Sequence, residues 1–314
     1  MTTTTTGSGI AHAIGTDGLF SLSLRSGAAR LRAVDGDTLR VRDRGAHDLA
    51  AMFTIDLGQG SAALRAIDGS TFFGGGRHAP DLDIDVPREA TIVVDAASGD
   101  LDATGTLGDQ RYRTASGEVT LADVSGRIAV EAVSGGVDLV ATGEAQLTVR
   151  TVSGDVQLRA DTIASLDVAT TSGDLRMDGR LAGAGPFGIV TVSGDVQLAP
   201  SGDLRIELAS LSGDLRSEIG GASDGGRGRR SLTVGKGGPL LTVRSLSGDV
   251  NVVRPPAVSD QSSAATAAPA SDPSPIPAPA PSSGDAKGGD PTDVEDPGDE
   301  IGRASCRERV CLVV

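Results

Sequence analysis

A short turn motif, Ser-Gly followed by an acidic or small residue, recurs along this chain and constrains its fold more than any other feature. Successive copies from Ser98 to Ser247 are separated by 18, 9, 9, 19, 19, 21, 19 and 35 residues. A period near 19 residues is typical of folds in which one small unit stacks on the next. Three variant copies read Ser116-Gly117-Glu118, Ser125-Gly126-Arg127 and Ser134-Gly135-Gly136. The residues predicted to form structural turns are Ser98, Gly99, Asp100, Ser153, Gly154, Asp155, Ser172, Gly173, Asp174, Ser193, Gly194, Asp195, Ser212, Gly213, Asp214, Ser247, Gly248 and Asp249.

The residues on both sides of each turn alternate between apolar and polar. One copy places Leu147, Val149 and Thr151 before the turn and Val156 and Leu158 after it, with polar side chains between them. This period of two is that of a β-strand with one buried face. Each repeat is therefore predicted to be a strand, a Ser-Gly-Asp corner and a second short strand.

Two short strands cannot bury their apolar face alone, whereas stacked copies share one continuous core. The sequence predicts an all-β fold, a single-chain parallel β-solenoid of about eight coils of about 19 residues over 91–254. An antiparallel β-sandwich is the alternative. It explains neither the constant phase of the apolar columns nor the recurrence of one turn.

Composition agrees with a narrow core and restricts the classes of partner. The chain holds 44 Gly but only five Phe, one Tyr and no Trp, which suits a core of aliphatic side chains. Its net charge of −14 argues against nucleic acid and anionic membranes as partners. No apolar run reaches the length of a membrane span, and Thr2–Thr6 follow Met1 without a signal-peptide pattern. A cytoplasmic location is expected from the chain as given.

The segments outside the repeat have different compositions. Residues 1–17 are predicted to be disordered, and 18–90 to form an irregular β cap at the N-terminal end of the solenoid. Residues 255–300, rich in Pro, Ala, Ser and acidic side chains, are predicted to be a disordered linker. The 35-residue step contains Glu218–Gly238, which is expected to form a flexible loop pushed out of one coil.

The last residues, 301–314, differ abruptly from the linker. Ile301–Val310 resembles an in-frame translation of a sequencing-library adapter, so 301–314 is interpreted as non-native sequence. Both cysteines, Cys306 and Cys311, lie there. On this interpretation a native C-terminal element is missing, and envelope association through that element is an open alternative.

The motifs needed for catalysis or cofactor binding are not evident in the sequence. His12, His47 and His78 precede the repeats and have no nucleophile–base or metal-ligand spacing. No catalytic, cofactor-binding or metal site is therefore predicted, and the corner acids are interpreted as structural. The weaker alternative is a Ca²⁺ ladder, because Ca²⁺-binding β-rolls also place Asp at stacked turns. Its candidate ligands are Asp155, Asp174, Asp195 and Asp214.

The recurring Val-Ser-Gly-Asp-Val-x-Leu resembles a bacterial family of β-strand-repeat proteins known as the "putative adhesin" family, a domain of unknown function. Leu82–Ala90, before the first repeat, is similar to that family's approach to its solenoid. The resemblance covers about 20–254 and implies a right-handed parallel β-helix-like fold with no established catalytic residues. The function expected from the sequence is a non-enzymatic structural or interaction scaffold, binding an unknown protein partner or associating with itself. An adhesin-like surface or envelope-stress protein and a self-assembling solenoid are the alternatives.

Overall fold

The structure is a computed structural model that describes residues 4–6, 8–67, 79–183, 185–226 and 228–255. All of these belong to one compact unit, Met1–Val258. The linker predicted beyond Pro255, the tail 301–314 and His78 lie outside the described residues.

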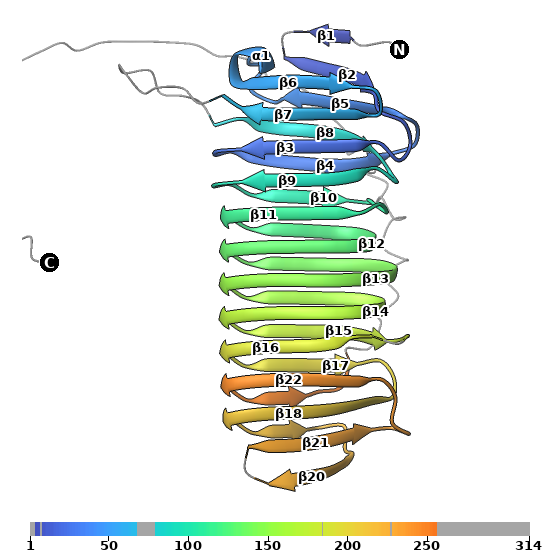
Figure 1. The fold of residues 1–314 in the computed structure, drawn as a ribbon, viewed down its shortest axis with the longest axis vertical. Coiled ribbons are helices and arrows are strands. Elements are labelled where there is room, and N and C mark those ends of the chain that lie inside the picture. Colours follow the sequence, from blue (N-terminus) through green and yellow to red (C-terminus); the bar gives the residue numbers. More distant parts are fainter. Residues whose placement is uncertain (1–3, 7, 68–78, 184, 227, 256–314) are drawn as a thin grey trace, which may run out of the picture. The chain divides into compact units, whose positions relative to one another are not determined.

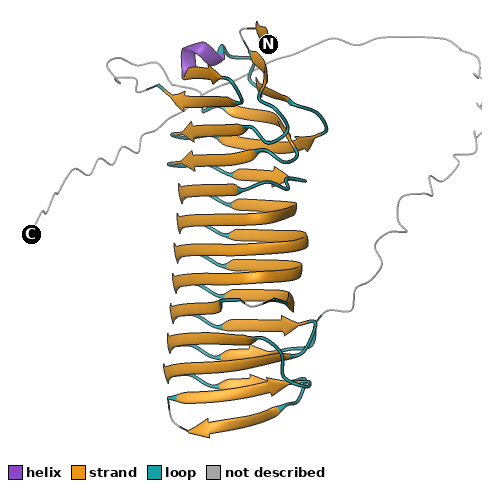
Figure 2. Ribbon diagram, turned by 45° about the vertical axis from the view of Figure 1, so that its right-hand side comes forward, coloured by secondary structure: helices purple, strands orange, loops and turns teal. Residues whose placement is uncertain are grey.

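The described unit is an all-β stack of mostly parallel strands, as predicted, and it has two packed layers (Figures 1 and 2). Each coil contributes one strand to each layer, and most neighbours are parallel. The long strands β12, β13 and β14 cross from one layer to the other, with register irregularities where they bend. We call the hydrogen-bonded layers ladder A and ladder B.

Ladder A contains the strands that run toward the Ser-Gly-Asp corners, together with β6 and β7 at one end and β20 and β21 at the other. Its spatial order is β6 (Phe53–Gly58), β7 (Ser61–Ala66), β3 (Leu19–Leu24), β9 (Thr91–Ala96), β11 (Gln110–Ser116), the second halves of β12 (Val119–Ser134), β13 (Val137–Ser153) and β14 (Val156–Ser172), then β16 (Phe187–Ser193), β22 (Leu240–Ser247), β18 (Leu204–Ser212), β21 (Arg229–Val234) and β20 (Ala222–Gly226).

Ladder B contains the strands that leave the corners and the antiparallel strands at the N-terminal end. Its spatial order is β1 (Thr4–Thr6), β2 (Gly9–Ala13), β5 (Thr38–Asp43), β8 (Asp81–Pro87), β4 (Ala28–Val34), β10 (Leu101–Thr104), the first halves of β12, β13 and β14, then β15 (Leu175–Leu181), β17 (Val196–Pro200), β23 (Val250–Val252) and β19 (Leu215–Ser217).

The core lies between the ladders and is almost entirely aliphatic. In β13, Val137 and Leu139 face inward from ladder B, while Leu147 and Val149 face inward from ladder A. The alternation read from the sequence is thus the alternation of burial. Tyr112 is the exception in size, and its buried hydroxyl donates to Gln110 Oε1 at 3.1 Å. Burial raises the pKa of the Tyr112 phenol.

The N-terminal prediction needs correction. Residues 9–13, expected to be disordered, form β2, in which Ile10 and His12 are buried and His12 Nε2 lies 2.8 Å from Gly58 O. Strands β3 and β4, expected in an irregular cap, lie within the parallel ladders, where β3 pairs with β7 and β9. The alternating Phe20, Leu22 and Leu24 fit the same core. Antiparallel β2, β5 and β6, with helix α1 (Leu49–Met52), complete this end.

The C-terminal prediction is also corrected. The segment expected to be a flexible loop forms β20 and β21, and β21 pairs antiparallel with β18. This hairpin covers a strand edge that would otherwise expose unpaired backbone groups. The chain then returns, and β22 inserts between β16 and β18. The coils therefore do not stack in chain order. The number of coils and the right-handed winding stay predictions.

Candidate functional site

The Ser-Gly-Asp corners stack on one another along one narrow edge of the unit, the left-hand edge in Figure 1. Their glycines have φ between +119° and +156°. A Cβ on any of them would approach the carbonyl oxygen of the neighbouring corner glycine closer than 3.0 Å. Glycine is required both by its conformation and by this close stacking. The column runs in the order Gly27, Gly99, Gly117, Gly135, Gly154, Gly173, Gly194, Gly248 and Gly213.

Sequence reasoning missed the first member of this column. Ser26-Gly27 has the same positive φ, +113°, and Gly27 O is the atom that a Cβ on Gly99 would meet. Ser125-Gly126, counted among the variants, belongs instead to the opposite edge, where Gly126 stacks on Leu107 O. The half-step of nine residues therefore marks the alternation between the two edges of one coil.

The corner acids hold neighbouring coils together. The Asp155 Oδ1 atom accepts a hydrogen bond from the Asp174 N–H at 2.9 Å, and Asp174 Oδ1 accepts from the Asp195 N–H at 2.9 Å. Asp195 accepts from the Asp249 N–H, and Asp249 from the Asp214 N–H, both at 2.8 Å. The acids act as acceptors for backbone donors of the next coil, which gives them a structural role.

The last corner acid, Asp214, has no further coil to bond. Arg230 of β21 donates to Asp214 Oδ1 at 2.6 Å, and Arg216 donates to Oδ2 at 3.3 Å. The hydrogen bond from Arg230 and the nearby positive charges lower the pKa of Asp214. The end hairpin thus replaces the missing coil at this corner. Within the described ranges, no three His, Cys, Asp or Glu side chains gather in a way that could hold a metal ion.

In the column from Gly99 to Gly213, a small hydroxyl or alanine side chain lies two positions before each corner serine, and it is buried at every level except that of the half-buried Ser210. Thr114 and Thr170 donate to the carbonyl oxygens of Ser116 and Ser172 in their own corners, at 2.9 and 3.3 Å. Each of these two hydrogen bonds lies within one coil and joins the end of the strand to the turn that follows it.

An exposed apolar column, which we call the ridge, follows the corners along the same edge. It occupies the position immediately before each corner serine, which the strand alternation places outside the core. Leu211 is 83% exposed, Val133 54%, Val152 50% and Leu246 48%. In spatial order the ridge comprises Ala97, Ala115, Val133, Val152, Thr171, Val192, Leu246 and Leu211.

A second exposed column, which we call the wall, lies two residues before the ridge on ladder A. Its first four members carry alternating charges and align in register as Asp95, Arg113, Glu131 and Arg150. Arg113 pairs with Glu131 at 3.1 Å and with Asp95 at 3.9 Å. The column continues as Ala169, Val190, Arg244 and Ala209.

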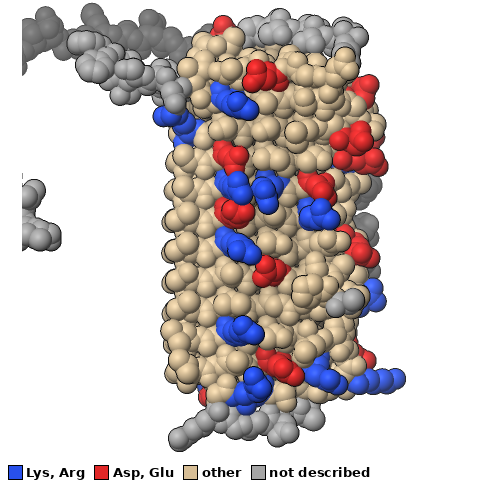
Figure 3. Space-filling view, in the orientation of Figure 1, with Lys and Arg blue, Asp and Glu red and all other residues tan. Residues whose placement is uncertain are grey.

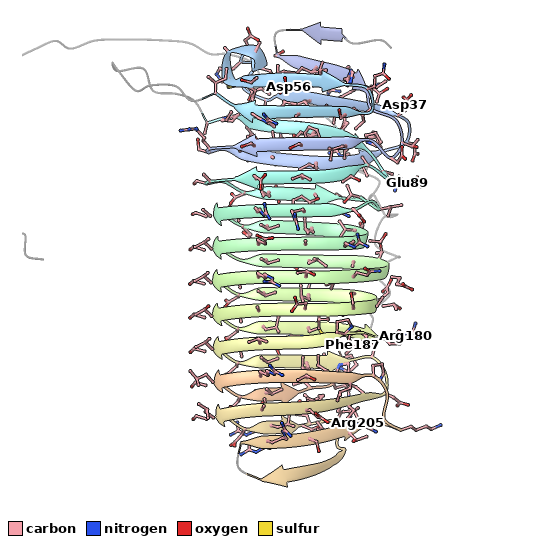
Figure 4. The ribbon with its side chains drawn as sticks, in the orientation of Figure 1. Asp37, Asp56, Glu89, Arg180, Phe187 and Arg205 are labelled. Atoms are coloured by element: carbon pink, nitrogen blue, oxygen red, sulfur yellow. The ribbon has the colours of Figure 1, made fainter. Side chains whose placement is uncertain are left out.

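Ridge and wall enclose a groove of about 1050 Å³ over the N-terminal half of this edge. Its floor is formed by Ala96, Thr114, Ala132 and Thr151, and Arg25 and Arg65 lie at its N-terminal end. Figure 3 shows the charged column beside an edge that is uncharged along most of its length. Figure 4 shows the short side chains that project from this edge at each level.

The apolar ridge was visible in the sequence but not interpreted there. Strict alternation puts the residue before each corner serine outside, so Val133, Val152, Val192, Leu246 and Leu211 were apolar residues at predicted surface positions. Of the ten large hydrophobic side chains exposed in the described residues, these five and Val190 lie on this one edge. Such a concentration is typical of an interaction surface.

Of the two histidines in the described ranges, His47 contacts an acid and His12 a backbone carbonyl. His47 Nδ1 lies 2.8 Å from Asp43 Oδ2, in a turn where Asp43 also accepts the N–H groups of His47 and Asp81. His12 is buried in β2. The Asp43–His47 pair holds together the N-terminal end of the fold. Among the described residues, no helix is long and apolar enough to cross a lipid bilayer.

Solved structures that match this chain include three bacterial proteins of low sequence identity. A "putative cell adhesion protein" from Clostridium sporogenes ATCC 15579 is 9% identical, with 78% of this chain and 98% of that chain covered and a TM-score of 0.24. A "putative adhesin" from Bacteroides fragilis NCTC 9343 is 10% identical, with 78% and 95% covered and a TM-score of 0.34. A "putative adhesin" from Parabacteroides merdae ATCC 43184 is 11% identical, with 79% and 96% covered and a TM-score of 0.24. Scores this low carry no functional argument.

A search of curated proteins finds no match to the sequence. A family model does match, over residues 25–253, and its description is Toastrack DUF4097. The match begins just before the Ser26-Gly27 corner and ends after β23, so it covers nearly all of the parallel stack. The chain belongs to the Toastrack DUF4097 family.

Proposed function

We propose that the solenoid is a non-enzymatic scaffold that binds a protein partner along its ridge and groove. The observation that carries this proposal is the gathering of six of the ten exposed large hydrophobic side chains on one edge. Leaving such a column in water has a free-energy cost, because each aliphatic side chain gains about 1.5 to 3 kcal/mol on full burial. A partner that covers the edge recovers part of that energy.

The rigidity of the edge supports the same function. The ridge is carried on strands whose corners are fixed by stacked glycines and by carboxylate–backbone hydrogen bonds. A partner therefore meets a preorganised surface, and little conformational entropy is lost on binding. The corner aspartates on this edge accept hydrogen bonds from the backbone of neighbouring coils. This structural use of the carboxylates favours a scaffold over a catalyst. The proposal applies to a cytoplasmic protein, as expected from the sequence, and equally to one at the envelope.

Site-specific photo-crosslinking in the native cell tests this function. A benzophenone amino acid replaces Val152 on the ridge in one variant and Leu107 on the opposite edge in the control. Leu107 is 38% exposed, so both probes sit at accessible aliphatic positions. We expect a discrete protein adduct from the Val152 probe and none from the Leu107 probe. Equal labelling from the two sites, or no adduct from Val152, would refute the proposed function.

A further inference from the structure

At three of the eight levels an arginine in the wall accompanies an acid in the corner column, and at three others the wall residue, Ala169, Val190 or Ala209, is uncharged. The coil with Arg113 in the wall has Glu118 at its corner, and the coil with Arg150 has Asp155. Arg244 is matched in the same way by Asp249. Where the wall is acidic at Glu131, the corner position is the uncharged Gly136. The one level with two acids is that of Asp95 and Asp100.

Within one molecule, the ridge separates the wall from the corner column. The two columns face each other directly only across an interface between two copies. From these charges and the shape of the edge we propose that a second copy of this chain covers it, forming a parallel dimer with its twofold axis along the stack. This inference rests on the proposed function and names the partner of that same edge.

Symmetry decides the direction of the second copy. A twofold axis parallel to the stack keeps the coils at the same level and places the wall of each copy against the corner column of the other. Arg113, Arg150 and Arg244 then oppose Glu118, Asp155 and Asp249 of the second copy, twice over. A twofold axis perpendicular to the stack would instead place corner column against corner column. Seven acids on each side would then face one another: Asp100, Glu118, Asp155, Asp174, Asp195, Asp249 and Asp214. The chain already has a net charge of −14, so this arrangement is disfavoured.

The shape of the edge also favours the parallel orientation of the second copy. The groove lies on the wall side of the ridge. Under a twofold axis parallel to the stack, each ridge can sit in the groove of the other copy. Under a perpendicular axis, ridge would meet ridge and groove would meet groove. The small floor residues Ala96, Thr114, Ala132 and Thr151 leave room for the second copy's Ala97, Ala115, Val133 and Val152. Such a contact is isologous and closed, as most homodimers are.

The contact would extend along the whole stack, since eight levels at about 4.8 Å span about 38 Å. The apolar ridge forms the centre of the contact and the charge pairs form its rim, which is the usual anatomy of an interface.

Disulfide trapping tests the direction. Val133→Cys and Val192→Cys are made separately in a chain that also carries Cys306→Ser and Cys311→Ser. In a parallel dimer, each ridge residue lies close to the same residue of the second copy. Each single variant should therefore form a covalent dimer under mild oxidation. Leu107→Cys on the opposite edge is the matched control and should stay monomeric. If Val133→Cys and Val192→Cys cross-link only when mixed with each other, the dimer is antiparallel and the inference is overturned.

Charge reversal tests the pairing by sedimentation equilibrium under reducing conditions. Arg113→Glu and Glu118→Arg should each raise the dimer dissociation constant on the order of tenfold, because two rim pairs per dimer change from attraction to repulsion. The double variant should recover the affinity, since the pairs re-form with reversed sign. Thermal unfolding followed by circular dichroism checks that all three variants fold.

Two further outcomes separate this inference from the proposed function. A protein that is monomeric at every concentration and whose Val152 probe labels a different protein contradicts the dimer but leaves the scaffold function standing. A monomer whose probe labels nothing contradicts both. A dimer that the double variant fails to restore also overturns the parallel arrangement.

Discussion

Replacing Gly154 by alanine tests whether the corners need glycine for their close stacking as well as for their backbone conformation. Gly154 has φ of +137°, and a Cβ there would overlap Gly135 O and Gly135 C in the neighbouring coil. The matched control is Gly143→Ala. Gly143 also has a positive φ, +78°, but no atom lies within 4 Å of the position of its Cβ.

The expected magnitudes follow from these surroundings. Alanine at Gly143 pays only the conformational cost of a left-handed residue, about 1 to 2 kcal/mol. Alanine at Gly154 costs at least as much, because its φ of +137° lies farther from the left-handed region near +57°, and it must also move the neighbouring coil away by roughly 1 Å to regain ordinary van der Waals separation. Two backbone hydrogen bonds beside the corner join these coils, from Gly135 N–H to Ser153 O at 3.1 Å and from Val137 N–H to Asp155 O at 2.9 Å. Losing both costs about 2 kcal/mol, so Gly154→Ala should destabilise by about 3 to 4 kcal/mol.

Urea unfolding followed by circular dichroism measures the difference between the two variants. We expect Gly154→Ala to lower the free energy of unfolding by about 2 kcal/mol more than Gly143→Ala does. Equal losses would show that backbone conformation alone explains the glycines, and the stacking argument would be wrong.

Three of the four remaining predictions concern buried or paired polar groups, and the fourth concerns calcium. Gln110→Leu removes the acceptor of the Tyr112 and Thr106 hydroxyls and should lower the free energy of unfolding by about 2 to 3 kcal/mol; a loss below about 0.5 kcal/mol would contradict the role of this buried network. Burial opposes ionisation of Asp43, but hydrogen bonds from His47 and Asp81 outweigh it, so its folded pKa is lowered. Its contribution to stability is therefore present above the unfolded pKa of about 3.9 and lost as pH falls through the folded pKa. Asp43→Asn should flatten the acid side of a stability–pH curve, and an unchanged curve would contradict this. Asp195→Ala removes the acceptor of the Asp249 N–H and should cost about 1 kcal/mol. Calcium should leave the melting temperature of the chain unchanged, because the corner acids already accept backbone hydrogen bonds. A rise on calcium addition would support the Ca²⁺ ladder instead.

The candidate surface illustrates how far local patterns reach. The period of two shows that Val152 points outward and that Val149 and Val156 point inward, and the structure agrees. The sequence also contains every charge of the wall and corner columns. What local alternation cannot show is which residues become neighbours across coils, because the spacing of corners varies from 18 residues to the 72 between Ser26 and Ser98. The groove exists only after those coils are in register.

By itself, the sequence determined the repeating unit of this protein. A corner that needs glycine and strands that alternate with period two are local requirements, and they fix the all-β class, the parallel stacking and the aliphatic core. Tertiary structure alone decided the order of the coils. Strand β22 lies between β16 and β18, and β3 lies between β7 and β9. In both cases the middle strand is not next to either neighbour in the chain. The physical reason is that all the strands of one ladder have nearly interchangeable edges. Which edges finally meet is decided by covering both ends of the stack with antiparallel hairpins, and this is a property of the whole fold.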